Sequence, residues 1–421
     1  MKNRLITNYL SELHKKERGR FIVITGARQT GKTTLAGHLF PDHQYISMDD
    51  PVERVDFQRL SAKDWLFRYP LAIIDEIQKL PSLFDTLKAC YDQDNKVRYL
   101  ILGSSQLMVI KKVKETLAGR VAICELFPFS ISEIATDSWD DHIKPPLLSL
   151  LIKEKDPKKI IELILSQNYS DQYLSRVRMV FEKFLKFGGM PPIYNETFNE
   201  EDSYQWLNDY QTTYLQRDLL DIAQLNHLEP FVRCQQALAL KNGQLVNFSE
   251  VAKLANVSAP TANKFFQYLE VSYQVIMLPA FFKNREKRLA KMGKLHFLDP
   301  GIYRGVLKKR GLVEGHEFES AVVAEIYKQV RTLRLPLSLY HLRTFDGKEV
   351  DLLIELENGY LAIECKMTEN VTTKDFRHLR GLQEILDKPL LAGLVVSNDR
   401  LIQIIDEKIP LLSVPAWNIV V

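Results

Sequence analysis

Residues 26–34 have the types and the spacing that bind phosphate groups. They read GARQTGKTT and comprise Gly26, Ala27, Arg28, Gln29, Thr30, Gly31, Lys32, Thr33 and Thr34. An apolar, β-branched run precedes them and a helical pattern follows, which is the strand–loop–helix context that a P-loop requires. Glycines let backbone N–H groups point at phosphate oxygens, and a helix N-terminus adds partial positive charge. We expect Lys32 to reach the β- and γ-phosphates of ATP and the Thr33 hydroxyl to take one position around Mg²⁺.

An acidic pair ends the second apolar strand, LAIIDEI at 71–77. In a P-loop ATPase a carboxylate at this place holds Mg²⁺, directly or through water, and its neighbour polarises the attacking water. We therefore expect Asp75 to hold the ion and Glu76 to act on the water. The alternative is a solvent-exposed strand end without chemistry.

Two further residues have places in the chain that suit nucleotide chemistry. The strand RYLILGSS at 98–105 delivers Ser104 to the carboxyl edge of a parallel sheet, where it could contact the γ-phosphate. It could instead be the N-cap of the next helix. Arg120, in LAGR at 117–120, could be a cation supplied to the nucleotide of a neighbouring subunit, which predicts a homo-oligomer. A surface arginine at a helix end is the alternative.

The composition is that of a globular protein with several domains. Of the 421 residues, 46% are hydrophobic and 26% charged, which argues against disorder and against a fibrous rod. No apolar run approaches the length of about 18 residues that a membrane-spanning helix needs, and residues 1–20 lack the apolar core of a secretory signal. The four cysteines lie far apart, so neither a zinc site nor a disulfide framework is indicated. We expect a cytoplasmic protein without membrane contact.

The middle of the chain contains a helix–turn–helix pattern and a basic stretch. Residues 248–278 read as two short helices joined by a turn at 256–258, then a third helix, with Ser258 as N-cap and Pro260 in the first turn of the helix after the turn. Residues 281–310 then hold ten Lys or Arg against two acids, although the whole chain carries only +3. This predicts a winged helix whose basic hairpin contacts nucleic acid such as DNA. A solvated hairpin or a protein-docking surface is the alternative.

Four ionisable residues form a composite pattern in the last hundred residues. Glu319 lies in a predicted helix, Asp351 in a strand at 348–356, and Glu364 and Lys366 in a strand at 360–366 that a turn joins to it. Glu364 and Lys366, two residues apart, point to one face. The pattern resembles the PD-(D/E)xK nuclease core, in which Asp351 and Glu364 would bind Mg²⁺ beside Glu319, and Lys366 would orient the nucleophile. An inert binding scaffold, or buried structural carboxylates paired with Lys366, are the alternatives.

Motifs along most of the chain resemble one prokaryotic family. GARQTGKTT, YISMDDP, IIDEIQ, ILGSSQ, LAGR and LFPFSISEI occur in that order, and GGMP, YLQRDL, LHFLDPG and GHEFE follow. They are similar to AAA-type ATPases with a C-terminal region known as DUF4143 (AAA_14/DUF4143). The resemblance implies a helical lid after the nucleotide core and makes Arg217, in YLQRDL, a candidate nucleotide-side residue. A solvated ion pair of Arg217 with its neighbour Asp218 is the alternative.

The sequence thus predicts an α/β chain with a parallel sheet, built from four parts. These are a P-loop ATPase core (1–135), a helical lid or insertion (136–225), a winged-helix-like domain (226–312) and a nuclease-like domain (313–421). The leading function is Mg²⁺-dependent ATP hydrolysis in a nucleic-acid-associated machine, with nuclease activity as an option. The alternatives are a nucleotide-switched signalling or scaffold ATPase with an inert nuclease-like domain, and an ATPase that remodels a protein partner.

Overall fold

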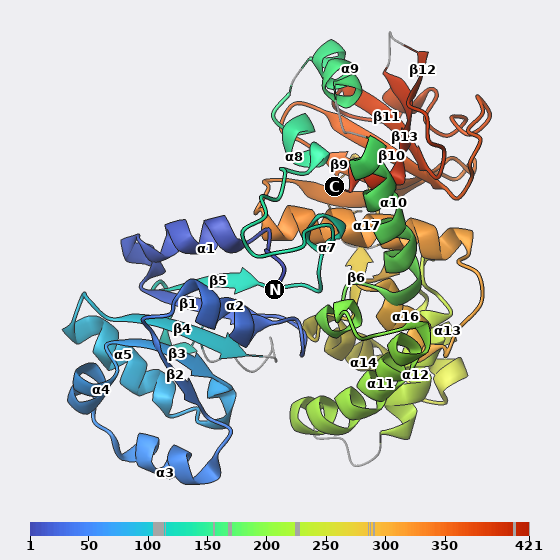
Figure 1. The fold of residues 1–421 in the computed structure, drawn as a ribbon. Coiled ribbons are helices and arrows are strands. Elements are labelled where there is room, and N and C mark those ends of the chain that lie inside the picture. Colours follow the sequence, from blue (N-terminus) through green and yellow to red (C-terminus); the bar gives the residue numbers. More distant parts are fainter. Residues whose placement is uncertain are drawn as a thin grey trace.

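The structure is a computed structural model that describes the chain except residues 104–112, 114, 155, 167–170, 224–227, 285, 287, 289, 290, 407–409 and 421, and except the side chains of 171 and 214–223. Figure 1 shows one sheet near the N-terminus, in blue and cyan, and a second near the C-terminus, in orange and red, with green to yellow helices beside them. In the described part of the chain, no helix is long and apolar enough to cross a lipid bilayer.

The N-terminal sheet has five parallel strands in the order β2-β3-β4-β1-β5. They are β1 (Phe21–Thr25), β2 (Gln44–Ser47), β3 (Leu71–Asp75), β4 (Arg98–Gly103) and β5 (Val121–Glu125). β1 and β4 are buried on both faces, which explains why their sequences are continuous apolar runs. The predicted α/β fold with a parallel sheet is confirmed, and all five carboxyl ends lie at one edge.

Helices cover both faces of this sheet. On one face, α1 (Thr7–His14) and α2 (Lys32–Leu39) share a core with β1, and on the other face α4 (Ala62–Arg68) and α5 (Leu83–Gln93) do so. Alternate β1 residues point to opposite faces and so serve both cores. The remaining elements of this part are α3 (Pro51–Arg59), which has no buried residue, and the short 3-10 turns η1 (Glu17–Gly19) and η2 (Ile77–Lys79).

The C-terminal sheet has six strands in the order β12-β13-β11-β10-β9-β8. They are β8 (Ser338–Arg343), β9 (Glu349–Glu355), β10 (Tyr360–Lys366), β11 (Leu390–Ser397), β12 (Gln403–Asp406) and β13 (Leu411–Pro415). β9 and β10 form the predicted antiparallel hairpin, whereas β10, β11 and β13 run parallel. The long helix α17 (Gly315–Thr332) packs on one face, and η4 (Leu382–Glu384) and α18 (Ala416–Ile419) complete this part.

The segment predicted as a helical lid or insertion, 136–225, lies in two places. α7 (Ile131–Ile134) precedes it, and it contains α8 (Leu147–Leu151), α9 (Pro157–Leu165), α10 (Asp171–Phe187), η3 (Pro191–Tyr194) and α11 (Glu200–Ala223). Ile164, Phe181 and Phe184 of α9 and α10 pack in the same core as α17 and the C-terminal sheet. Among its described residues, those that line a cavity shared with residues 28–34 belong to the later part, η3 and α11. An amphipathic sequence pattern predicts that a helix buries one of its faces, but it does not indicate which part of the protein that face packs against.

The stretch 248–278 contains the two helices predicted around the turn, but the third helix predicted after them is wrong, because a strand, Val275–Leu278, stands in its place. α12 (Glu229–Ala239), α13 (Phe248–Ala255) and α14 (Ala259–Val271) share one core with α16 (Pro300–Val306), and β6 (Val275–Leu278) pairs with β7 (Lys294–Phe297). The turn between α13 and α14 has Asn256 in the left-handed conformation, at φ 54°, and Ser258 caps α14 by accepting from the N–H of Thr261. Assignment of these elements to a winged helix remains a prediction.

The β6–β7 hairpin, residues 275–297, docks on the C-terminal sheet. The Phe281 N–H donates to the His341 carbonyl at 2.7 Å, and the His341 N–H donates to the Pro279 carbonyl at 3.0 Å. Arg288 pairs with Glu355 at 2.9 Å and lies over the rings of Phe281 and Tyr340. The segment after β6 is therefore joined to the edge strand β8 by an isolated bridge at Ala280 and His341.

Candidate functional site

The P-loop runs from the end of β1 to the start of α2. It turns with Gly31 at φ 88° and Gln29 at φ 60°, the left-handed region that glycine adopts most easily. The Lys32 ammonium donates to the carbonyls of Gly26 at 3.0 Å and Ala27 at 2.8 Å. Thr30 braces the loop from inside by donating to the Ala27 carbonyl. The loop is thus curled around its own lysine, with the helix α2 N-terminus behind it.

The acidic pair lies against the P-loop, as the order of the parallel strands requires. The Thr33 hydroxyl donates to Asp75 Oδ2 at 2.7 Å, and the Tyr45 hydroxyl donates to the same oxygen at 3.1 Å. Glu76 follows at φ 51° and donates its N–H to Asp75 Oδ1 at 2.9 Å. Hydroxyl and carboxylate oxygens are the ligands that Mg²⁺ prefers, so Thr33 and Asp75 are suited to hold it.

Glu76 is held in a partly buried position beside cations. Its carboxylate accepts from the Gln78 amide. Burial raises the pKa of the Glu76 carboxyl, an effect that the Arg28 guanidinium opposes and the Asp75 carboxylate reinforces. A carboxylate with a raised pKa is a stronger base, which suits a group that takes a proton from water.

A cavity of about 680 Å³ opens over these groups. Its floor contains most of the predicted residues, namely Arg28, Gln29, Gly31, Lys32, Thr33, Thr34, Asp75 and Glu76. Its other wall comes from the middle of the chain, as Pro191 and Pro192 of η3 and Tyr210 and Thr213 of α11. The volume lies within the range of small-molecule and cofactor sites. The glycine loop, the lysine and the paired oxygen donors all fit a nucleoside triphosphate with Mg²⁺.

Two P-loop contacts were not predicted from the sequence. Arg4, almost fully buried, donates to the Thr30 carbonyl at 2.8 Å and to the Phe127 carbonyl at 2.6 Å, and pairs with Glu133 at 3.2 Å. Ala27 packs in one cluster with Tyr273 and Phe127. No motif marks Arg4, because two of its partners are backbone carbonyls that any residue can supply and the third, Glu133, is distant in the sequence.

Tyr273 joins the N-terminal sheet to the middle of the chain. Its hydroxyl lies 2.7 Å from the Thr25 hydroxyl, on the residue directly before the P-loop, and 3.5 Å from Glu125 at the end of β5. Tyr273 follows α14 and has φ 62°, a strained conformation for a bulky side chain. The predicted helix–turn–helix segment is therefore in direct contact with the base of the P-loop.

Arg120 lies away from the nucleotide cavity of its own chain. It precedes β5, whose first residue pairs with Phe21 at the amino end of β1. Since β1 leads to the P-loop over five residues, Arg120 is roughly 16 Å from the loop along the strand direction. Its guanidinium pairs with Asp92 at 3.0 and 3.2 Å. Ser104, the predicted γ-phosphate contact, lies outside the described residues, and so does the side chain of Arg217.

The four predicted C-terminal residues, Glu319, Asp351, Glu364 and Lys366, lie close together, and a second lysine, Lys294, lies beside them. Asp351 accepts from the Cys365 N–H at 2.8 Å, and Lys366 donates to Glu364 at 2.7 Å. The Lys294 ammonium, from β7, lies 2.6 Å from Glu319, 3.2 Å from Asp351 and 3.1 Å from Glu349. We name Glu319, Glu349, Asp351 and Glu364 the carboxylate cluster.

Burial and mutual repulsion perturb this cluster. Burial, with the nearby Asp351 carboxylate, raises the pKa of Glu319 to about 8 and that of Glu364 to about 7. Burial disfavours the charge of Lys294, but the carboxylates of Glu319 and Asp351 outweigh it and raise the pKa of Lys294 above its usual value. The lysine is therefore a full positive charge at neutral pH.

The predicted Mg²⁺ at Asp351 and Glu364 does not fit this arrangement. Among the described residues, no group of three or more His, Cys, Asp or Glu is arranged to hold a metal ion. Both Asp351 oxygens already have donors, the Lys294 ammonium at Oδ1 and the Cys365 N–H at Oδ2, and the Lys366 ammonium lies on Glu364 Oε1. Mg²⁺ at about 2.0–2.1 Å from Asp351 would have to displace one of these donors. The sequence pattern could not show this, because Lys294 comes from a segment that contacts the cluster only in the folded chain.

The basic stretch is largely neutralised by acids from other segments. Arg304 is buried in a two-pronged pair with Glu317, Arg288 is paired with Glu355, and Lys294 with the carboxylate cluster. Lys309 and Arg310 also have carboxylate partners. The local excess of positive charge counted from the sequence is therefore much smaller on the folded surface.

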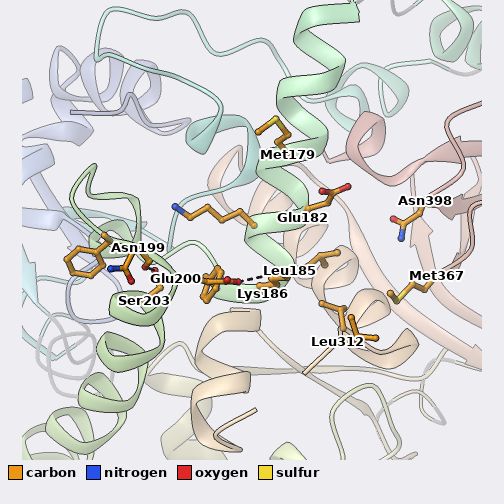
Figure 2. Close-up of a pocket in the computed structure, with 14 residues that line it drawn as sticks. Met179, Glu182, Leu185, Lys186, Asn199, Glu200, Ser203, Leu312, Met367 and Asn398 are labelled. Atoms are coloured by element: carbon orange, nitrogen blue, oxygen red, sulfur yellow. Dashed lines mark hydrogen bonds and ion pairs between the residues drawn. The ribbon is translucent and has the colours of Figure 1, made fainter. Parts of the chain in front are cut away.

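A second cavity, of about 630 Å³, lies apart from the nucleotide site and is bordered by α10 and the start of α11 (Figure 2). Figure 2 shows Met179 and Leu185 of α10 facing Leu312 and Met367 across it, with Lys186 paired to Glu200. None of the predicted site residues lines it.

Three family models match consecutive parts of the chain. Residues 18–135 match an AAA domain, residues 179–312 a domain of unknown function (DUF8612), and residues 314–417 a domain of unknown function (DUF4143). The second match begins in α10 and extends to the end of the predicted winged-helix-like part.

Two curated relatives and two solved structures are similar to the chain. The uncharacterized proteins Mb2031c of Mycobacterium bovis and Rv2008c of Mycobacterium tuberculosis are each 27% identical over 362 residues, 83% of this chain and 71% of theirs. The Walker-type ATPase PABY2304 of Pyrococcus abyssi aligns at 12% identity and TM-score 0.46, over 73% of this chain and 96% of that chain. A signal transduction ATPase with numerous domains, PH0952 of Pyrococcus horikoshii, aligns at 13% identity and TM-score 0.26, over 75% and 44%. The chain therefore carries an AAA domain followed by a C-terminal DUF4143 domain, the combination that its motifs predicted.

Proposed function

We propose that this protein binds ATP with Mg²⁺ in the P-loop cavity and hydrolyses it. The observation that carries the proposal is the 2.7 Å bond between the Thr33 hydroxyl and Asp75, with Lys32 and Glu76 around one cavity. Each of these groups has the chemistry that phosphoryl transfer to water needs.

Each residue of the site has a role in hydrolysis that follows from its position. The P-loop N–H groups and Lys32 bind the phosphates and offset their charge. Thr33 and Asp75 would hold Mg²⁺, which supplies further neutralisation of the phosphate oxygens. Glu76 orients the attacking water and accepts its proton, and Gln78 holds the Glu76 carboxylate in place.

Loss of the lysine tests this assignment. Lys32→Ala should abolish ATP turnover, because the phosphates lose their cation, and should leave the fold intact, because the ammonium donates to carbonyls of the P-loop and not to a distant element. Lys88→Ala, an exposed lysine on α5, is the matched control and should turn over ATP as the wild type does. Unchanged hydrolysis in Lys32→Ala would contradict the assignment of the site.

We further propose that nucleotide occupancy switches the rest of the chain. Support comes from the two places where the middle segment touches the nucleotide site: the Tyr273–Thr25 contact at the base of the P-loop, and the cavity wall formed by Pro191 and Pro192. A movement of the P-loop on phosphate binding would change both the Tyr273–Thr25 contact and the position of the cavity wall. Nucleotide-dependent protection of 188–194 and 271–276 in hydrogen exchange would support the switch, and identical exchange with and without ATP analogue would refute it.

Nucleic-acid association is a second candidate, carried by the exposed face of α14. In the predicted winged helix, α14 is the second helix, and Asn263, Lys264 and Gln267 lie exposed on it. Asn and Gln can bond to adenine edges, and Lys can contact phosphate. Asn263→Ala with Gln267→Ala should weaken duplex DNA binding and DNA-stimulated ATP turnover, whereas Lys374→Ala, exposed in the C-terminal domain, should not. DNA that neither binds nor stimulates turnover would favour a protein partner instead.

The C-terminal domain is proposed to be nuclease-like in fold. The supports are the antiparallel β9–β10 pair that carries Asp351, Glu364 and Lys366, and the helix α17 that brings Glu319. Cleavage of linear, circular and branched DNA with Mg²⁺ or Mn²⁺, beside Asp351→Ala, tests whether the fold retains activity. Cleavage that Asp351→Ala abolishes would establish a nuclease, and no cleavage would favour the switch ATPase with an inert domain.

A further inference from the structure

The carboxylate cluster contains a cation that belongs to the chain itself. Lys294 is 3% exposed, and its ammonium contacts three carboxylates, from α17 and β9, at 2.6–3.2 Å. Three carboxyl groups around one ammonium resemble the coordination of a bound ion and exceed the single contact of an ordinary ion pair. The lysine comes from the β6–β7 hairpin, outside the C-terminal domain as the sequence delimits it.

We propose that the Lys294 ammonium permanently takes the place of a divalent metal ion, so that the folded chain binds no divalent ion at the carboxylate cluster. The proposal concerns the cation of this cluster and does not depend on ATP hydrolysis. A second cation cannot share the oxygens of Glu319, Glu349 and Asp351 that the ammonium contacts, because a divalent ion at about 2.0–2.1 Å from them would lie against the ammonium.

The lysine is held in place by the fold around it. Its backbone pairs with Leu278 across the hairpin and bridges to Leu245. The hairpin in turn is bonded to His341 of the edge strand β8 and to Glu355 of β9. The backbone of Lys294 is therefore fixed, and movement of an exposed loop cannot withdraw its ammonium from the cluster. To do that, the hairpin would have to separate from the sheet.

The cluster retains the capacity to accept a cation once the lysine is removed. Asp351 and Glu364 are buried and the Glu319 side chain is mostly so, and Glu364 Oε2 accepts no hydrogen bond from any residue that the structure describes. Without Lys294, Glu319 and Asp351 would lose their cationic partner, and buried carboxylates without a cation are costly. A divalent ion would relieve that cost.

The decisive experiment exchanges the cation. Full-length Lys294→Met, which keeps an unbranched chain of similar length, is titrated with Mn²⁺ in the absence of nucleotide, beside the wild type and Lys291→Met. Lys291 is an exposed lysine of the same hairpin segment. Lys294→Met should bind Mn²⁺ at least about tenfold more tightly than the other two, since a full positive charge in contact with the ion is gone. Its unfolding temperature should be below that of the wild type without Mn²⁺ and should rise on its addition, a shift absent from Lys291→Met.

A second comparison keeps the proposal testable if Lys294→Met does not fold. Bound Mn²⁺ in the wild type is counted by electron paramagnetic resonance and compared with Asp351→Asn. Equal counts support a lysine-occupied cluster. A wild-type ion that Asp351→Asn loses, or a Lys294→Met variant that gains no affinity for Mn²⁺, would overturn it. DNA cleavage is a separate readout: a metal-loaded Lys294→Met that does not cleave would count against nuclease activity and would still support the cation exchange.

Discussion

Gly188 packs against Asp299 so closely that a single methyl group should break the contact. A Cβ at Gly188 would lie 1.9 Å from Asp299 Oδ1, and the residue has φ 73°, where alanine is strained. Asp299 is buried and accepts from the Gly189 N–H at 2.7 Å and from the Ile302 N–H at 3.0 Å, which caps α16. Gly188→Ala must therefore displace the carboxylate from both donors.

The cost can be assembled from three terms. The left-handed conformation costs alanine about 1–2 kcal/mol. Loss of the α16 cap costs about 1 kcal/mol, and a buried Gly189 N–H left without an acceptor costs about 1–3 kcal/mol. Gly188→Ala should thus lower the free energy of unfolding by about 3–6 kcal/mol. In an Asp299→Ala background only the first term remains, so the coupling between the two sites should be about 2–4 kcal/mol.

The assay is a double-mutant cycle of urea unfolding. Gly188→Ala, Asp299→Ala and the double variant are compared with the wild type by tryptophan fluorescence. ATP binding is measured in parallel, because Pro191 and Pro192, just after Gly188, line the nucleotide cavity. A Gly188→Ala cost that is the same in both backgrounds would refute the steric argument.

Three further predictions concern other contacts. Arg120→Ala should leave ATP binding intact and lower turnover by about 10³-fold in self-associated protein; wild-type turnover would leave Arg120 as a surface residue. Tyr273→Phe, which removes the 2.7 Å bond to Thr25, should lower the free energy of unfolding by about 1–2 kcal/mol, and an unchanged urea midpoint would show that this bond adds nothing. His14 and His43 lie Nε2 to Nε2 at 3.1 Å, and burial, with repulsion from His43, lowers the pKa of His14 to about 4. Between about pH 6.5 and 4 the unfolded chain binds more protons than the folded chain, so the free energy of unfolding decreases as the pH falls through that window. His14→Gln should make this decrease smaller by about 1 kcal/mol, a value that allows for the half-exposed ring. Urea unfolding at pH 7 and pH 5 measures the difference.

The ATPase part could be predicted because its chemistry is local in sequence. A P-loop needs eight contiguous residues between a strand and a helix, and the order of parallel strands brings Asp75 beside Thr33. The same locality made the β9–β10 hairpin and the α13–α14 turn readable from turn residues and periodicity. The wall formed by Pro191 and Tyr210 had no such signal, since nothing local relates it to residue 32.

Charge and burial across distant segments could not be predicted. Arg288, Lys294 and Arg304 looked like a basic surface because a count along the chain does not see Glu355, Glu319 or Glu317. The motifs GGMP and LHFLDPG were recognisable but unexplained until Gly188 and Asp299 were found in contact. Each of these errors or gaps is a long-range pairing, which sequence periodicity does not encode.

The packing of α8–α10 on the C-terminal sheet also has a consequence for synthesis on the ribosome. α10 ends at Phe187 and β8 begins at Ser338, so about 150 residues separate these helices from the first strand of the sheet that covers them. Because synthesis proceeds at roughly 5–20 residues per second, the apolar faces of these helices stay uncovered for on the order of ten seconds before the sheet is made. The nascent chain therefore passes through a stage in which Phe181 and Phe184 are uncovered while the AAA domain is already complete. Chaperones that bind exposed apolar helices would act at that stage, and substitutions that slow translation between residues 187 and 338 should increase aggregation without changing the folded protein.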